Sequence, residues 1–134
     1  MIFGIGHDIV ENERIKRLYD RYGNSFLSKI LSFYEINVFK NQNKSINYLA
    51  KRFAAKEAFA KACGTGIRTP ILFTAITVDN DVLGKPFFSF DKAINNWFSK
   101  YNIHNVYLSL SDENKLSSAF VVLETCKQQN EECI

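Results

Sequence analysis

The sequence contains few cysteines and prolines, no long apolar run and no strong excess of charge. Three cysteines, Cys63, Cys126 and Cys133, are too few and too irregularly spaced for a metal site or a disulfide framework. No stretch is long and apolar enough to cross a membrane, and no signal peptide follows Met1. We therefore expect a cytoplasmic protein that does not act at a membrane.

Net charge and length limit the possible functions and the number of domains. A formal charge of +3 is too small to indicate nucleic-acid binding by itself. The 134 residues give room for one domain, which we place at residues 1–126, with the polar residues 127–134 as a loose tail. A domain of this size buries only about two thirds of its unfolded surface, and 14% of its residues are aromatic. Both features favour an oligomer.

Hydrophobic periodicity predicts a mixed fold. β-branched or alternating segments predict strands at residues 2–10, 73–78, 86–90, 106–110 and 119–123. Apolar residues at three- and four-residue steps, with capping signals, predict helices at residues 15–31, 32–40, 45–63 and from 91 onward. Ser32 and Glu35 have the spacing of a capping box, and Gly64 is a helix stop. This order favours an α+β domain with a mostly antiparallel sheet packed against one long helix.

The first candidate site lies at the end of the long helix. Glu57 and Lys61 are four residues apart and Lys56 is adjacent to Glu57, so a carboxylate and two ammonium groups would share one side. The glycines of Gly64-Thr65-Gly66 would leave amide groups uncovered, which suits phosphate. The ordinary alternative is a solvated Glu–Lys pair followed by a helix cap, and on this segment alone it is the commoner outcome.

Two further candidates are shorter. Asp8 stands where the first strand ends, and Mg²⁺ needs only one or two protein carboxylates when phosphate oxygens and water complete its shell. An aspartate that caps the next turn is the alternative. The neighbouring His7 has no partner at metal-ligand spacing. Residues 84–86 (Gly-Lys-Pro) connect two strands, and a hairpin turn with an edge-strand proline explains them without any ligand.

Taken together, these segments form a more specific pattern. Residues 4–10 (GIGHDIV) are followed by Arg14 and Ile15, residues 52–58 (RFAAKEA) by Lys61 and GTGI, and residues 79–86 read DNDVLGKP. This series resembles the signatures of the 4′-phosphopantetheinyl transferases, in particular the short bacterial holo-[acyl-carrier-protein] synthase type. The likeness extends over residues 2–124 and implies the 4′-phosphopantetheinyl transferase fold.

The resemblance implies an activity and a set of site residues. A serine of acyl carrier protein would attack the β-phosphate of coenzyme A, releasing adenosine 3′,5′-bisphosphate, in support of fatty acid biosynthesis. The resemblance also implies a homotrimer with active sites between subunits, and Mg²⁺ held by Asp8 and Glu57. We expect Asp8, Glu57 and Lys61 to be catalytic. We expect coenzyme A to contact Lys56, Lys61, Gly64, Thr65, Gly66, Gly84, Lys85 and Pro86.

Two questions stay open at this level. The proton of the attacking serine could leave through Glu57 and a metal-bound water, or through that water as hydroxide. Some relatives carry a histidine after the strand at 106–110, where this chain has Asp112, so no role of that histidine carries over. A non-enzymatic coenzyme-binding module and a structural oligomerisation domain are the alternatives to an enzyme.

Three arginines on the first predicted helix form a candidate binding surface for a protein partner. Arg14, Arg17 and Arg21 lie at i, i+3 and i+7, away from the apolar line of their helix. A solvated face is the ordinary interpretation. Three guanidinium groups in two turns repel one another unless an anionic surface meets them, however, and the resemblance implies an acidic carrier-protein helix as that surface.

Overall fold

The computed structural model describes residues 1–126, so the tail predicted at residues 127–134 lies outside the described residues. In chain order the elements are β1 (Ile2–Glu11), α1 (Asn12–Tyr22), α2 (Asn24–Ile30), α3 (Phe33–Asn41), α4 (Ile46–Cys63), the 3₁₀ turn η1 (Phe73–Ala75), β2 (Ile76–Asn80), β3 (Pro86–Phe90), α5 (Lys92–Tyr101), β4 (Ile103–Asp112) and β5 (Leu116–Thr125). No helix in this part of the chain has the length and apolar character needed to span a membrane.

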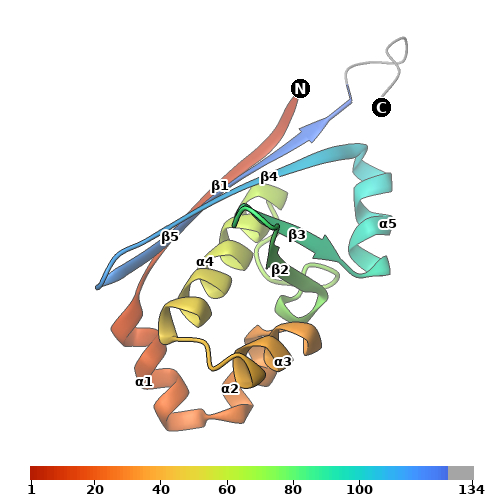
Figure 1. The fold of residues 1–134 in the computed structure, drawn as a ribbon. Coiled ribbons are helices and arrows are strands. Elements are labelled where there is room, and N and C mark those ends of the chain that lie inside the picture. Colours follow the sequence, from red (N-terminus) through yellow and green to blue (C-terminus); the bar gives the residue numbers. More distant parts are fainter. Residues whose placement is uncertain (127–134) are drawn as a thin grey trace.

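Two antiparallel sheets form the β part of the fold. The larger has the strand order β1-β5-β4, and β2 pairs with β3 in a separate hairpin. The long helix α4 lies across one face of the larger sheet, with α1 to α3 gathered near its start and α5 at the opposite end (Figure 1). The predicted α+β class, with a mostly antiparallel sheet against one long helix, is confirmed.

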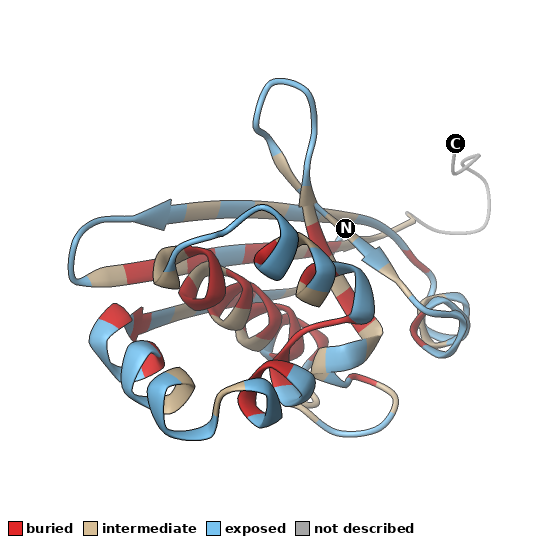
Figure 2. Cartoon of the chain, turned by 60° about the horizontal axis from the view of Figure 1, so that its bottom comes forward, coloured by how far each residue is buried: buried red, intermediate tan, exposed pale blue. Residues whose placement is uncertain are grey.

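Small residues allow α4 to lie directly on β1. The helix buries an alanine at almost every turn, and much of its ribbon is coloured as buried in Figure 2. On β1, a Cβ added to Gly4 would lie 2.0 Å from the carbonyl oxygen of Ala62, and one added to Gly6 would lie 1.8 Å from that of Ala58. Only glycine fits at these two positions, because the backbones of strand and helix are in contact.

Several predicted elements differ in their bounds. The helix expected at residues 15–31 is two helices, because Gly23 has a φ of +54° and its amide closes the end of α1 on Tyr19. Residues 73–75 form a 3₁₀ turn instead of the first part of a strand. The capping box of Ser32 and Glu35 is confirmed, and so is the helix stop at Gly64, which has a φ of +78°.

The other face of the larger sheet is apolar and has no covering element among residues 1–126. Ile5 and Ile9 of β1, Tyr107 of β4 and Phe120 of β5 are each exposed, by 58, 57, 51 and 44% respectively. Phe120 stands opposite His7 on β1 and Ser109 on β4, so these side chains share the face that points away from α4.

Candidate active site

Asp8 and Lys61 meet where β1 crosses α4. Lys61 Nζ donates to Asp8 Oδ1 at 3.1 Å and to the carbonyl oxygen of His7 at 2.9 Å. The Asp8 side chain is only 15% exposed, whereas that of Lys61 is 53% exposed. Asp8 lies on the same side of β1 as Gly6, which brings its carboxylate to the helix face that carries Lys61.

Glu57, one turn before Lys61, completes a group of charges. Burial raises the pKa of the Glu57 carboxyl, and the negative charge of Asp8 raises it further. The cations Lys61 and Arg14 oppose that rise. The Arg14 guanidinium reaches toward α4 from α1, 5.7 Å from the centre of the Phe53 ring. Two carboxylates that repel each other are therefore held together beside two cations.

This donor set fits one hard divalent cation. Mg²⁺ is commonly held by one or two carboxylates and completes its shell with water and substrate phosphates. The described residues contain no group of three or more histidine, cysteine, aspartate or glutamate side chains at metal-binding distance. The two carboxylates thus suit a magnesium site that substrate phosphates and water complete.

The loop after α4 does not present its amides as predicted. The amide of Gly64 donates to the carbonyl oxygen of Lys61 and that of Gly66 to Ala60, so both close the end of the helix. Thr65 Oγ1 donates to the carbonyl oxygen of Gly66 at 2.8 Å. The prediction that glycine amides are left uncovered here is wrong for Gly64 and Gly66, because the helix cap uses them.

The turn at residues 81–85 is exposed and is held by hydrogen bonds from its own residues and Asn80. One oxygen of Asp81 accepts from the amides of Leu83 and Lys85, each at 2.9 Å, and Asn80 Nδ2 donates to the carbonyl oxygen of Gly84. Gly84 has a φ of +89°, which glycine adopts without strain. The Lys85 side chain remains on the surface, free to meet an anionic ligand.

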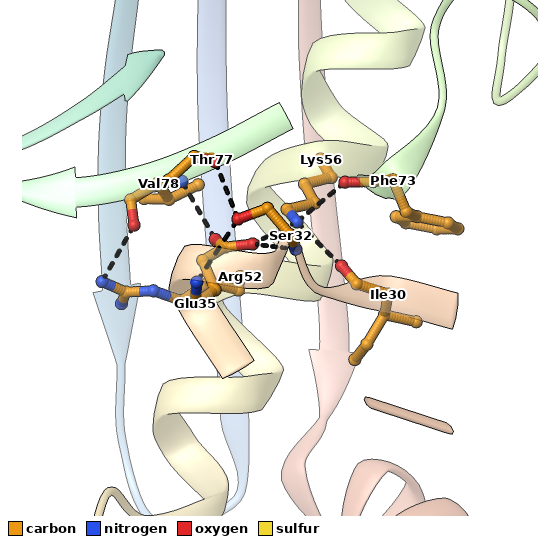
Figure 3. A network of polar contacts seen from close by, with 8 residues as sticks. All are labelled: Ile30, Ser32, Glu35, Arg52, Lys56, Phe73, Thr77 and Val78. Carbon is orange, nitrogen blue, oxygen red and sulfur yellow. Dashed lines mark hydrogen bonds and ion pairs between the residues drawn. The ribbon is translucent and has the colours of Figure 1, made fainter. Parts of the chain in front are cut away.

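Lys56 does not face the Asp8–Glu57 group. It is fully buried, and its ammonium donates to Glu35 and to the carbonyl oxygens of Ile30 and Phe73 (Figure 3). Burial lowers the Lys56 pKa to about 8, although Glu35 opposes that shift. The predicted contact between Lys56 and coenzyme A is wrong for this arrangement, because no part of the side chain reaches the surface.

A cationic pocket of about 450 Å³ lies beside the start of α4 and was missed at the level of sequence. Lys44, Lys51 and Arg52 line it, and Arg52 lies 3.9 Å above the Tyr48 ring with its buried Nε unpaired. Lys51 is held by Asp112, at 3.5 Å. The spacing of Lys44, Tyr48 and Arg52, each four residues apart, was the available signal.

The three arginines of the predicted stripe are exposed on α1. Arg21 stacks on Tyr22, 5.2 Å from its ring centre. None of the three forms an ion pair within the part of the chain that the structure describes. The positive charge of Arg14 also lowers the pKa of Glu57, so Arg14 is the end of the stripe that lies near the candidate site.

Comparison with known proteins identifies the class. Residues 4–120 match the model of the 4′-phosphopantetheinyl transferase superfamily. The chain is 48% identical to the holo-[acyl-carrier-protein] synthase of Nitrosomonas eutropha over 124 residues, covering 92% of this chain and 99% of the relative. It is 50% identical to that of Neisseria meningitidis with the same coverage. The chain therefore belongs to the 4′-phosphopantetheinyl transferase superfamily.

Solved structures agree with the sequence comparison. The crystal structure of the Neisseria meningitidis synthase has a TM-score of 0.90 at 50% identity, covering 93% of this chain and 100% of that one. The Bacillus anthracis synthase in complex with CoA (3′,5′-ADP) has a TM-score of 0.78 at 39% identity, with 94% and 99% coverage. The Helicobacter pylori synthase in complex with coenzyme A has 0.79 at 30%, with 90% and 99% coverage. The resemblance inferred from the sequence signatures is confirmed.

Proposed function

We propose that this protein is a holo-[acyl-carrier-protein] synthase that transfers 4′-phosphopantetheine from coenzyme A to a serine of apo-acyl carrier protein. The other product is adenosine 3′,5′-bisphosphate. The observation that carries the proposal is the junction of Asp8, Glu57 and Lys61 between β1 and α4, in a chain of this superfamily. The cytoplasm is the compartment we expect, and residues 1–126 would act as one domain.

The site residues have distinct proposed roles. Asp8 and Glu57 would hold Mg²⁺, which when bound neutralises charge on the diphosphate. Lys61 would donate to a phosphate oxygen, since its half-exposed ammonium can leave Asp8 by rotation of its side chain.

The coenzyme has two proposed contact regions. Lys61 and the loop at residues 64–66 would lie along the diphosphate, and residues 84–86 would border the nucleotide. The pocket of Lys51 and Arg52 offers guanidinium and ammonium donors to a further phosphate.

The partners follow from two surfaces. The apolar sheet face of Ile5, Ile9, Tyr107 and Phe120 supports an interface between subunits, for which we propose the homotrimer. The exposed arginines of α1 support docking of an acidic carrier-protein helix next to the active site.

Mass spectrometry tests the activity directly. Apo-acyl carrier protein incubated with this protein, coenzyme A and Mg²⁺ should gain one phosphopantetheine, a mass of about 340 Da. Chelation of the metal should prevent the gain, and Asp8→Asn is the matched inactive control. Binding of coenzyme A without any mass gain would instead identify a coenzyme-binding module.

A further inference from the structure

Lys56, the residue before Glu57 on α4, forms a fully buried ion pair with Glu35 (Figure 3). The Lys56 ammonium uses all three of its donors: one on Glu35, one on the carbonyl oxygen of Ile30 at 2.8 Å and one on that of Phe73 at 2.9 Å. A single side chain of α4 thereby binds the end of α2, the start of α3 and η1.

Glu35 extends the network to the small hairpin. Its Oε1 accepts from the amide of Ser32 and its Oε2 from the amide of Val78 on β2, each at 2.9 Å. The Ser32 hydroxyl accepts from Thr77 Oγ1 at 2.7 Å. Both carboxylate oxygens are therefore occupied, and β2 is fixed to the first turn of α3.

Arg52, one turn before Lys56 on α4, continues the connection. Its Nη2 donates to Asn80 Oδ1 at 3.0 Å and lies 3.5 Å from the carbonyl oxygen of Val78. Asn80 in turn holds the carbonyl oxygen of Gly84 at 2.9 Å. The face of α4 that carries Arg52 and Lys56 is thus linked by hydrogen bonds to the turn before β3, while Glu57 and Lys61 point to the Asp8 side.

We propose that the Lys56–Glu35 pair is a positioning element of the transferase site. It fixes the distance between the two halves of the coenzyme site, which are Glu57 with Lys61 on α4 and the turn at residues 84–86. This inference rests on the proposed function and assigns Lys56 and Glu35 no contact with substrate.

Stability alone does not require such a pair. Replacing a whole buried ion pair by apolar side chains of similar volume is often neutral or stabilising, whereas removing one partner strands a buried charge. Apolar packing, however, tolerates small shifts between elements. Donors aimed at Ile30 and Phe73 and acceptors aimed at Ser32 and Val78 specify one arrangement of four segments about α4.

The test separates stability from positioning. Lys56→Met leaves the Glu35 carboxylate without its counter-ion and should be strongly destabilised. The double variant Lys56→Met/Glu35→Met removes both charges and should be more stable than Lys56→Met, while remaining below the wild type because backbone groups of Ile30, Ser32, Phe73 and Val78 lose their partners. It should still show a Michaelis constant for coenzyme A raised on the order of tenfold, because misplacement of a binding group costs affinity. The constant for carrier protein should stay unchanged.

A second variant and a control guard against a folding defect. Asn80→Ala alters an exposed residue, cuts the same chain of contacts at its far end, and should also raise the coenzyme A constant. Ser117→Ala removes a buried hydrogen bond to Asn12 outside the network, so it should lower stability and leave the coenzyme A constant at its wild-type value.

Hydrogen exchange provides a measurement that needs no substrate. Amides of residues 78–85 should exchange faster in the folded double variant than in the wild type, while those of β1 and β5 should not change. This holds even if the protein does not transfer phosphopantetheine, so failure of the proposed function stays distinguishable. The inference is overturned if the double variant and Asn80→Ala both show wild-type hydrogen exchange in this segment and wild-type coenzyme A kinetics.

Discussion

Lys61→Ala should change two affinities in opposite directions. In the structure the Lys61 ammonium is the counter-ion of Asp8, with its Nζ 3.1 Å from Oδ1. In the proposed reaction the same ammonium donates to a phosphate of coenzyme A. A divalent cation on Asp8 and Glu57 would repel that ammonium, so metal and lysine compete for one carboxylate. Removing Lys61 should therefore strengthen Mg²⁺ binding and weaken coenzyme A binding.

The geometry sets the size of both effects. The Lys61 side chain is 53% exposed, so its pair with Asp8 belongs with surface pairs, which contribute about 0.2–1 kcal/mol. Mg²⁺ affinity should rise between roughly 1.4- and 5-fold, since 1.4 kcal/mol corresponds to a factor of about ten. A hydrogen bond to a charged group contributes about 1.5–3 kcal/mol. Taking the lower end because of solvent screening, we expect a roughly tenfold higher Michaelis constant for coenzyme A.

Calorimetry of Mg²⁺ binding without coenzyme measures the first effect, and steady-state kinetics at saturating Mg²⁺ measures the second. Because loss of Lys61 also removes a cation that lowers the Glu57 pKa, the titration belongs at about pH 8, where a carboxyl remains ionised. Lys16→Ala is the control, since it removes a lysine of similar exposure that pairs with Asp20 on α1, away from the site. Unchanged Mg²⁺ affinity with unchanged coenzyme A kinetics would refute both roles of Lys61.

Other perturbations test the remaining parts of the proposal. Asp8→Asn or Glu57→Gln should lower kcat/KM on the order of 10²-fold or more with the circular dichroism spectrum retained; wild-type turnover at low Mg²⁺ would show that the metal assignment is wrong. Arg17→Glu/Arg21→Glu, which leaves Arg14 beside Glu57 unchanged, should raise the constant for carrier protein by about 10- to 100-fold, reduce its salt dependence and spare that for coenzyme A; equal losses for both substrates would indicate misfolding. The melting temperature should rise with protein concentration because a subunit interface completes the core, and sedimentation of an active monomer at micromolar concentration would contradict the trimer. Burial raises the pKa of the Cys63 thiol from 9.0 to about 12, so its contribution to the free energy of unfolding is complete below pH 9 and is lost as pH rises toward 12. Denaturant titrations at increasing pH should therefore show a smaller alkaline loss for Cys63→Ala, and identical losses in both proteins would rule this out.

Local signals in the sequence located most of the elements. The capping box of Ser32 and the stop at Gly64 are formed by residues close in sequence, so they could be read directly. The break at Gly23 was missed because the apolar spacing of the residues on either side continues as in one helix. A glycine inside a periodic pattern is compatible with a continuous helix as well as with a stop.

The orientation of Lys56 shows why one candidate residue was wrong. Lys56 and Glu57 are neighbours on α4, about 100° apart around the helix axis. Alanines on several sides of this helix make it apolar around much of its circumference, and 12 of its 18 residues are buried. Such a helix lacks the single polar face from which orientation is usually inferred. The partner Glu35 lies 21 residues earlier, and only the tertiary structure brings it to Lys56.

The glycines of β1 explain why Asp8 and Glu57 share a site at all. An aspartate side chain is short, so its carboxylate can join groups on α4 only if strand and helix lie unusually close. Gly4 and Gly6 provide that closeness, since a Cβ on either would lie 2.0 Å or less from a carbonyl oxygen of α4. Ala58 and Ala62 are the residues met on the helix, and they are small as well. The two signature segments of the sequence are therefore one structural unit, in which small residues bring the backbones together and the charged residues between them form the site.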